Sequence, residues 1–182
     1  MADPSFERDR DPSGRARNAR PRDGLGRPLP RGSTAGSERV PDELHLSVDA
    51  AVALAQRYLD SGRPFHAHEV LEALWKTRPA SERDLWQGLA QIAVGHTHAL
   101  RGNSVGATTL LRRGAARIAN YSITNDNATN DGVTHDSVTN DSGDTHGIDI
   151  VGVLAWAAEL AASPTGQPTK LRLSDADGLR DP

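Results

Sequence analysis

Two side chains capable of acid–base or metal chemistry and one aromatic side chain follow one another at helical spacing. His68, Glu72 and Trp75 are four and then three residues apart, so on a helix they share one face. An imidazole and a carboxylate one turn apart have Cβ atoms about 5–6 Å from each other, close enough to reach one cation or to work as an acid–base pair. The spacing predicts a polar centre at His68 and Glu72, with Trp75 as a wall of the pocket.

A second polar stripe follows on the next predicted helix. Gln87, Gln91 and His98 are also spaced so that they share one face. If the two helices pack together, both stripes meet in one pocket, with Gln87 and Gln91 lining it. Neutral imidazole and carboxylate suit zinc, manganese, iron or nickel, so the candidate ligands of a divalent transition metal are His68, Glu72 and His98.

The same pattern has a structural interpretation. A His–Glu pair at this spacing occurs by chance on many helices, and two ligands do not complete a metal site. The polar residues then form a buried hydrogen-bond network that fixes the packing of the two helices. Two functions follow from these residues. One is a metal- or small-ligand-binding protein, including a metal-dependent enzyme, and the other is a non-catalytic interaction or structural domain.

Five stretches with helical hydrophobic periodicity position these residues. Ser47 and Asn103 are typical helix N-caps, and Gly62 and Gly102 are typical of positions just beyond a helix end. The spacing of the apolar residues predicts helices within residues 47–62, 65–76, 81–101, 103–118 and 149–162. The expected fold class is therefore all-α, a compact bundle of about five helices with an extended N-terminal arm and a disordered insertion.

Composition agrees with a small helical core. Of the 182 residues, 36% are hydrophobic and 4% are aromatic, while Gly and Pro number 17 and 11. The apolar run at residues 150–162 is too short to span a bilayer, so a membrane protein is excluded. The absence of cysteine excludes a disulfide scaffold and a thiolate metal site. No apolar signal segment follows the first residues, so we expect a cytoplasmic protein.

The chain divides into an arm, a domain and a tail. Residues 1–43 are an Arg/Gly/Pro-rich N-terminal arm, 44–162 the helical domain and 163–182 a C-terminal tail, in which residues 171–173 are expected to lie extended on the surface. Within the domain, residues 122–146 form a low-complexity insertion that contains four tandem pentapeptides. Such a segment is expected to be disordered.

Charge gives no reason to expect nucleic acid or a membrane as a partner. The net charge is -3, and the nine arginines of the first 40 residues are interspersed with six acidic residues. The composition leaves a protein partner and a small-molecule ligand open.

Several motifs in one order resemble a known family. They are Phe65-His66-Ala67-His68-Glu69-Val70-Leu71-Glu72-Ala73-Leu74-Trp75, then Gln87-Gly88-Leu89-Ala90-Gln91, His98 and Arg101-Gly102-Asn103. This order resembles domain-of-unknown-function family 309, whose signature is His, three residues, Glu, two residues, then Trp or Tyr. The resemblance covers roughly residues 48–119 and returns at 146–149. It implies a small all-helical domain of bacteria and archaea without an established activity, for which metal binding has been suggested.

The N-terminal arm carries a further resemblance. Residues 17–23 and 25–30 are similar to the arms of actinobacterial members of that family. This similarity implies an arm that packs on the domain. The pentapeptide insertion departs from the family, which has a short turn at that place.

Overall fold

Residues 21–30, 33, 40, 46–130, 145–166 and 169–174 are described by the computed structural model, without the side chains of 125–130. The helices are α1 (Val48–Asp60), α2 (Pro64–Thr77), α3 (Arg83–Leu100), α4 (Ser104–Asn130) and α5 (Ile150–Ala162), and a short 3-10 turn, η2 (Ala80–Glu82), precedes α3. Within these ranges the chain forms isolated β-bridges but no strand. The predicted all-α bundle of five helices is confirmed.

Side chains cap three of the helices at their N-termini. Each accepts a hydrogen bond from the backbone N–H three residues further along, at Ser47 (3.3 Å), Asn103 (3.0 Å) and Asp149 (2.8 Å). Gly62 and Gly102, just beyond α1 and α3, have φ of 70° and 77°, a conformation that favours glycine. Caps and glycines therefore set the helix boundaries where the sequence predicts them.

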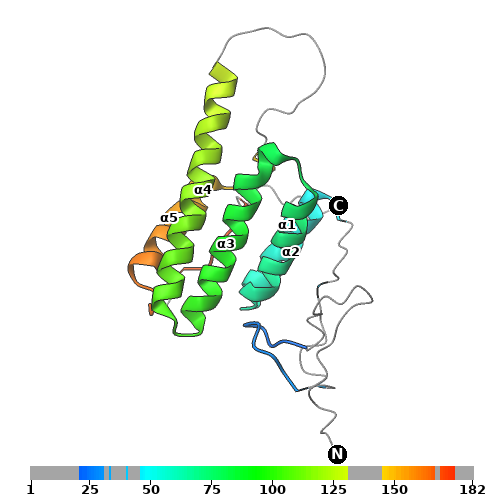
Figure 1. Cartoon of the computed structure of the whole chain (residues 1–182), viewed down its shortest axis with the longest axis vertical. Helices are drawn as coiled ribbons and strands as arrows, with labels where there is room; N and C mark the ends of the chain where they lie inside the picture. The colour runs from blue at the N-terminus through cyan, green and yellow to red at the C-terminus, as the bar shows by residue number, and fades with distance from the viewer. Residues whose placement is uncertain are drawn as a thin grey trace, which may run out of the picture.

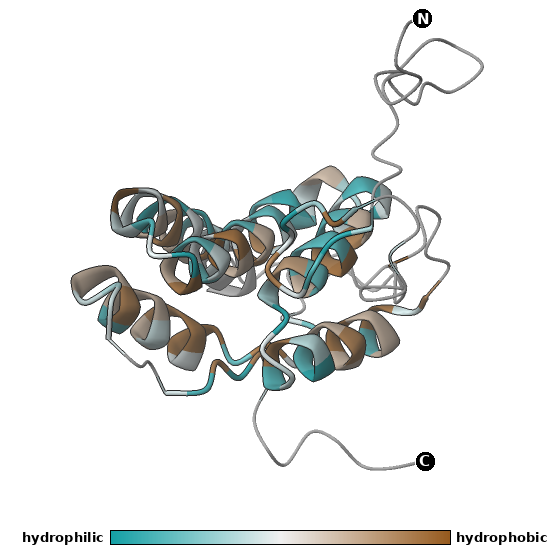
Figure 2. Cartoon of the chain, turned by 90° about the horizontal axis from the view of Figure 1, so that it is seen from below, coloured by the Kyte–Doolittle hydropathy of each residue, from teal (hydrophilic) through white to brown (hydrophobic). Residues whose placement is uncertain are grey.

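The helices form two layers. Helices α2, α3 and α4 lie side by side in one layer, and α1 and α5 form the second (Figure 1, Figure 2). Helices adjacent in the chain are also neighbours in space, from α1 with α2 to α4 with α5. Figure 2 shows the apolar faces turned toward the space between the layers. The described helices include none that is long and apolar enough to cross a membrane.

Helices α3 and α4 approach each other at glycines. A Cβ atom added to Gly88 would lie 2.9 Å from the carbonyl oxygen of Gly114, and one added to Gly114 would lie 2.7 Å from that of Gly88. Further along, a Cβ at Gly95 would lie 2.8 Å from Leu111. Only hydrogen atoms fit between the backbones at this crossing.

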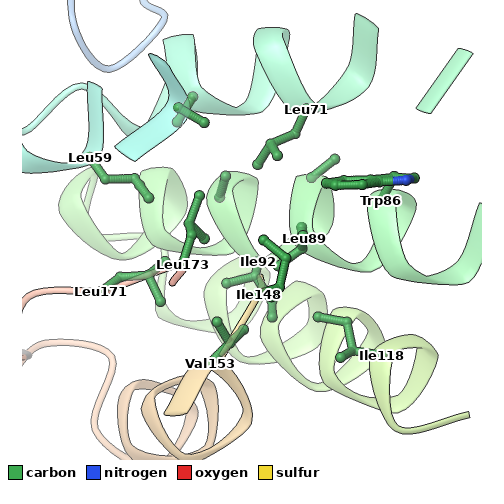
Figure 3. Close-up of a cluster of buried hydrophobic side chains, with 14 of the residues drawn as sticks. Leu59, Leu71, Trp86, Leu89, Ile92, Ile118, Ile148, Val153, Leu171 and Leu173 are labelled. Carbon is green, nitrogen blue, oxygen red and sulfur yellow. The ribbon is translucent and has the colours of Figure 1, made fainter. Parts of the chain in front are cut away.

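The core lies between the two layers. The fully buried side chains include Trp86, Leu71, Leu89, Ile92 and Ile118, which come from α2, α3 and α4 (Figure 3). The predicted apolar stripes of these helices are therefore the ones that face the core.

The C-terminal segment belongs to the core as well. Leu171 and Leu173 are buried, so the prediction that residues 171–173 lie on the surface is wrong (Figure 3). Gln56, buried in α1, donates through Nε2 to the carbonyl oxygen of Leu171 at 3.1 Å. Its Oε1 accepts from the N–H of Leu173 at 2.8 Å. One side-chain amide thus pairs with an extended backbone as a neighbouring strand would.

Helix α4 is longer than the sequence predicts. It continues to Asn130, through the first pentapeptide and part of the second, so the expectation of no helix in this stretch is wrong for residues 123–130. Asn, Asp and Thr are poor helix formers, but extending a helix costs far less than starting one. The hydroxyl of Thr124 also donates to the carbonyl of Asn120. The rest of the predicted insertion, up to residue 144, lies outside the described residues.

Candidate functional site

The predicted pair on α2 is formed. His68 Nε2 lies 3.7 Å from Glu72 Oε2, one helical turn further along. Lys76 Nζ lies 3.1 Å from the other carboxylate oxygen of Glu72. The His68 side chain is 22% exposed and that of Glu72 38%, so the pair lies at the surface of the bundle with the imidazole deeper than the carboxylate.

The environment of His68 favours a neutral ring. Burial lowers the pKa of His68, while the Glu72 carboxylate and the backbone of Ala90 on α3 act in the opposite direction. The ring centroid of Phe65 lies 6.0 Å from that of His68. A neutral imidazole can accept and donate a hydrogen bond or bind a metal ion.

The α3 residues lie next to this pair. Because His68 contacts the backbone of Ala90, the adjacent Gln91 lies at the level of His68 on the neighbouring helix. The Oε1 atom of Gln91 is buried and has no hydrogen-bond partner. Gln87 follows one turn away and is half-buried. Trp75 is also half-buried and packs against the core. We call His68, Glu72, Trp75, Gln87 and Gln91 the α2–α3 face.

His98 lies elsewhere. Its Nδ1 lies 2.8 Å from Nδ2 of Asn103, in the turn between α3 and α4. Eight residues separate it from Ala90, which corresponds to about 12 Å along the helix axis. No group of three His, Cys, Asp or Glu residues in the described part of the chain could hold a metal ion. The structure therefore brings His68 and Glu72 together but does not bring His98 to them.

The N-terminal arm covers one end of the α2–α3 face. The guanidinium carbon of Arg22 lies 5.3 Å from the centre of the Phe65 ring. Gly26 has φ of 77°, and an added Cβ atom would lie 2.3 Å from that ring. Arg101, at the end of α3, donates to the carbonyl oxygen of Leu25. For residues 21–30, the expectation that the arm packs on the domain is confirmed.

A second polar cluster, missed by the sequence analysis, centres on Glu82. This side chain is buried, and its carboxylate accepts hydrogen bonds from Nε and Nη2 of Arg78 at 2.8 and 2.5 Å. The indole Nε1 of Trp86 donates to it at 2.7 Å, and His146 Nε2 lies 3.1 Å away. The ring centroids of His146 and Trp86 are 5.3 Å apart. The cluster joins the α2–α3 connection to the residues that precede α5.

The charge of Glu82 is stabilised by these partners. Burial by itself would raise the pKa of Glu82, but the hydrogen bonds from Arg78 and Trp86, together with the charge of His146, lower it to about 2. Arg78, Glu82 and Trp86 are spaced four residues apart, a pattern in the sequence that could have indicated them. The position of His146 has no such local signal. The buried carboxylate is therefore paired by side chains of the described part of the chain.

A fourth histidine, His96, is half-buried against the core. His96 on α3 stacks edge-on against Trp156 of α5, with ring centroids 5.1 Å apart. Its Nδ1 is buried without a hydrogen-bond partner, and burial lowers the pKa of His96 to about 4. His96 therefore stays neutral near neutral pH and packs as an aromatic side chain.

Bundle and polar face together define a small all-helical domain with a surface His–Glu centre. The model of the family described as Domain of unknown function (DUF309) matches residues 52–110. This stretch runs from α1 into the first turns of α4 and contains the whole α2–α3 face. No curated protein and no solved structure matches the chain.

Proposed function

We propose that the protein binds a small polar molecule on the α2–α3 face. The observation that carries this proposal is the buried Oε1 of Gln91, which has no hydrogen-bond partner and belongs to the residue that follows Ala90, the backbone contact of His68. A buried polar atom without a partner costs about 1–3 kcal/mol, so a ligand that satisfies it gains that free energy on binding.

The side chains of the face define the chemistry of such a ligand. Neutral His68 offers a donor and an acceptor, Glu72 offers an acceptor, and the amide of Gln91 offers either. Trp75 supplies an apolar wall beside these groups. A molecule with hydroxyl or amide groups on one edge and an apolar opposite edge matches this set. Lys76 lies 3.1 Å from Oε1 of Glu72, so a ligand would meet the carboxylate at its other oxygen, Oε2.

A divalent metal ion is a possible part of this complex. The donor set fits in part, because two ligand atoms 3.7 Å apart can share one ion at about 2.0–2.2 Å from each. His68 and Glu72 would hold zinc, manganese, iron or nickel as a Lewis acid, with the remaining ligands from water or the bound molecule. His98 is not placed to complete the set.

A second candidate function is a non-catalytic interaction or structural domain. The observation that favours it is the ion pair between Lys76 and Glu72, which already neutralises the carboxylate at the surface. In this case, the polar residues of the face fix the packing of α2 against α3 and bind nothing.

The test measures binding to the full chain and to matched variants. Amide chemical shifts of the 15N-labelled protein are followed against zinc, manganese and nickel, and against a fragment library of hydroxyl and amide compounds. The variants are His68→Ala and Glu72→Gln. Glu159→Gln, an exposed carboxylate on α5, is the control for charge, and His98→Ala is the control for a histidine away from the face.

The outcomes separate the candidates. Saturable shifts at α2 and α3 amides that are lost in His68→Ala and Glu72→Gln, and kept in both controls, support the proposal. Metal binding that also disappears in His98→Ala would support the site predicted from the sequence, with His68, Glu72 and His98 as its three ligands. If no probe gives saturable shifts at the face, the ligand-binding proposal is wrong and the structural function remains. In that case, His68→Ala lowers the free energy of unfolding by about 1–3 kcal/mol.

A further inference from the structure

Two arginines from distant parts of the chain converge on one turn of the N-terminal arm. Nη1 of Arg22 donates to the carbonyl oxygen of Gly26 at 2.6 Å. Arg101 donates through Nη2 to the carbonyl oxygen of Leu25, the preceding residue. Both guanidinium groups are therefore anchored to adjacent carbonyls of the same turn. Arg101 lies 76 residues after its partner Leu25 in the sequence.

Neither arginine has its charge neutralised by the residues around it. In the described part of the chain, no carboxylate forms an ion pair with Arg22 or Arg101. The Nε atoms of both are buried and have no hydrogen-bond partner. The acidic residue of the turn, Asp23, uses its Oδ1 to accept from the N–H groups of Leu25 and Arg27 at 3.0 and 2.7 Å.

The positive end of helix α2 lies at the same place. Helix α2 has Pro64 at its start, no side-chain cap at Arg63 and no acidic residue in its first turn. The next residue, Phe65, packs directly against Gly26 of the turn. Pro64 has no N–H, and the N–H groups of His66 and Ala67 donate to the carbonyl oxygen of Arg63, so the N–H of Phe65 and the helix dipole are what α2 offers an anion. Two cationic side chains and one helix end without a side-chain cap thus meet at the same turn, whose one carboxylate, Asp23, accepts from backbone N–H groups.

We propose that Arg22, Arg101 and the N-terminus of α2 form a binding site for an oxyanion, the phosphate or carboxylate group of a small molecule. A guanidinium group that is anchored by one Nη holds its other Nη in a fixed orientation, as a donor to such a group. This site lies beyond the Phe65 ring from His68 and does not depend on the His68–Glu72 pair. The proposal therefore does not rest on the function proposed for the α2–α3 face.

The experiment follows the arginine Nε–H signals of the 15N-labelled full chain. Inorganic phosphate, acetate and succinate are titrated separately at constant ionic strength, with chloride as the reference anion. Arg22→Lys and Arg101→Lys assign the two signals. We expect phosphate or a carboxylate to move both signals and the Phe65 amide along one saturable curve. A lower dissociation constant for phosphate than for acetate and succinate identifies a phosphate site, and the reverse order identifies a carboxylate site.

Variants show which groups carry the binding. Arg22→Gln and Arg101→Gln are each expected to weaken the anion by about tenfold or more, because each removes a charge-assisted hydrogen bond. Arg113→Gln, which removes an exposed arginine on α4, leaves the dissociation constant unchanged. His68→Ala also leaves it unchanged, which separates this site from the α2–α3 face.

Two results would overturn the proposal. One is the absence of saturable shifts at both arginine signals of the unaltered protein with every anion. The other is equal weakening in Arg113→Gln and in the Arg22 and Arg101 variants, because this would show a general effect of net charge. Arg101→Gln could release the arm, which would be seen as loss of the contact between Phe65 and Gly26. In that case, the anion-binding proposal is judged from the titrations of the unaltered protein and of Arg22→Gln.

Discussion

Glu82 and His146 lie 3.1 Å apart although 64 residues separate them in the chain. Glu82 ends the 3-10 turn before α3, and His146 precedes α5 with a positive φ of 52°. In the sequence, the two residues stand on either side of α3 and α4. Their contact fixes the start of α5 against the α2–α3 connection, with Trp86 packed beneath the His146 ring.

We expect Glu82→Gln to lower the free energy of unfolding by about 2–3 kcal/mol at neutral pH. The amide keeps the shape of the side chain but removes the charge that Arg78 and His146 face. Urea unfolding of the full chain measures the effect. Glu159→Gln, at an exposed position of α5, is expected to change stability by less than about 0.5 kcal/mol. Equal effects in the two variants would show that the Glu82 cluster does not stabilise the fold.

The same carboxylate makes stability depend on acid pH. The pKa of Glu82 is about 2 in the folded protein and 4.5 ordinarily, so its contribution is complete above pH 4.5. As pH falls from 4.5 toward 2, the unfolded chain gains a proton that the folded chain does not, and about 3 kcal/mol is lost. The stability difference between the unaltered protein and Glu82→Gln is expected to shrink over this range. A difference that stays constant from neutral pH to about pH 3 would contradict the lowered pKa.

His96 is expected to make the free energy of unfolding depend on pH in a higher range than Glu82 does. Its pKa is about 4 in the folded protein and 6.5 ordinarily, because the charged ring would lose its hydration in the core. Stability falls as pH decreases from 6.5 toward 4, since only the unfolded chain takes up this proton. His96→Leu removes that part of the decrease. Unfolding free energies of both proteins at pH 7 and pH 5 measure it, and parallel decreases in the two proteins would show that His96 titrates normally.

Leu173→Ala is expected to cost about 2–5 kcal/mol, as much as Leu89→Ala in the centre of α3. Both side chains are about 1% exposed, so either truncation leaves a cavity. Leu100→Ala, at a position 46% exposed, is the control and changes stability little. If Leu173→Ala behaves like Leu100→Ala, the C-terminal segment is not part of the core in solution.

Gly88→Ala is expected to destabilise the protein by about 1–2 kcal/mol, although alanine favours helices. The new methyl group would lie 2.9 Å from the carbonyl oxygen of Gly114, which is backbone and cannot move without separating α3 from α4. Gly106→Ala is the matched control on α4, where the nearest atoms are the ends of the His98 and Asn103 side chains. Thermal unfolding compares the two. A higher melting temperature for Gly88→Ala would show that the helix crossing is looser.

The sequence was sufficient to predict the features that depend on neighbours in the chain. The caps at Ser47 and Asn103 and the His68–Glu72 pair all join residues three or four positions apart, and each is formed. Helical periodicity fixes such pairs because one turn brings them together whatever the rest of the fold does.

Features that depend on the packing of distant segments were not predictable in the same way. Spacing puts His98 on the face of α3 that carries Gln91, with about 10 Å between the two residues along the helix axis. It does not show which residues of α2 lie opposite each of them. Glu82 meets His146 only because the bundle folds back on itself. Leu171 and Leu173 carry too short an apolar pattern to indicate burial, and Gln56, their partner, lies more than a hundred residues earlier.

The bonds from Gln56 to the C-terminal segment also set an order of events during synthesis. Helix α1 leaves the ribosome 115 residues before its partner Leu171. At bacterial or eukaryotic elongation rates this interval is on the order of ten seconds. Throughout it, the amide of Gln56 lacks its partners in the C-terminal segment and keeps only the local bond from Nε2 to Asp60, at 3.1 Å. The core is therefore complete only after residues 171–173 emerge, because Leu171 and Leu173 are part of it.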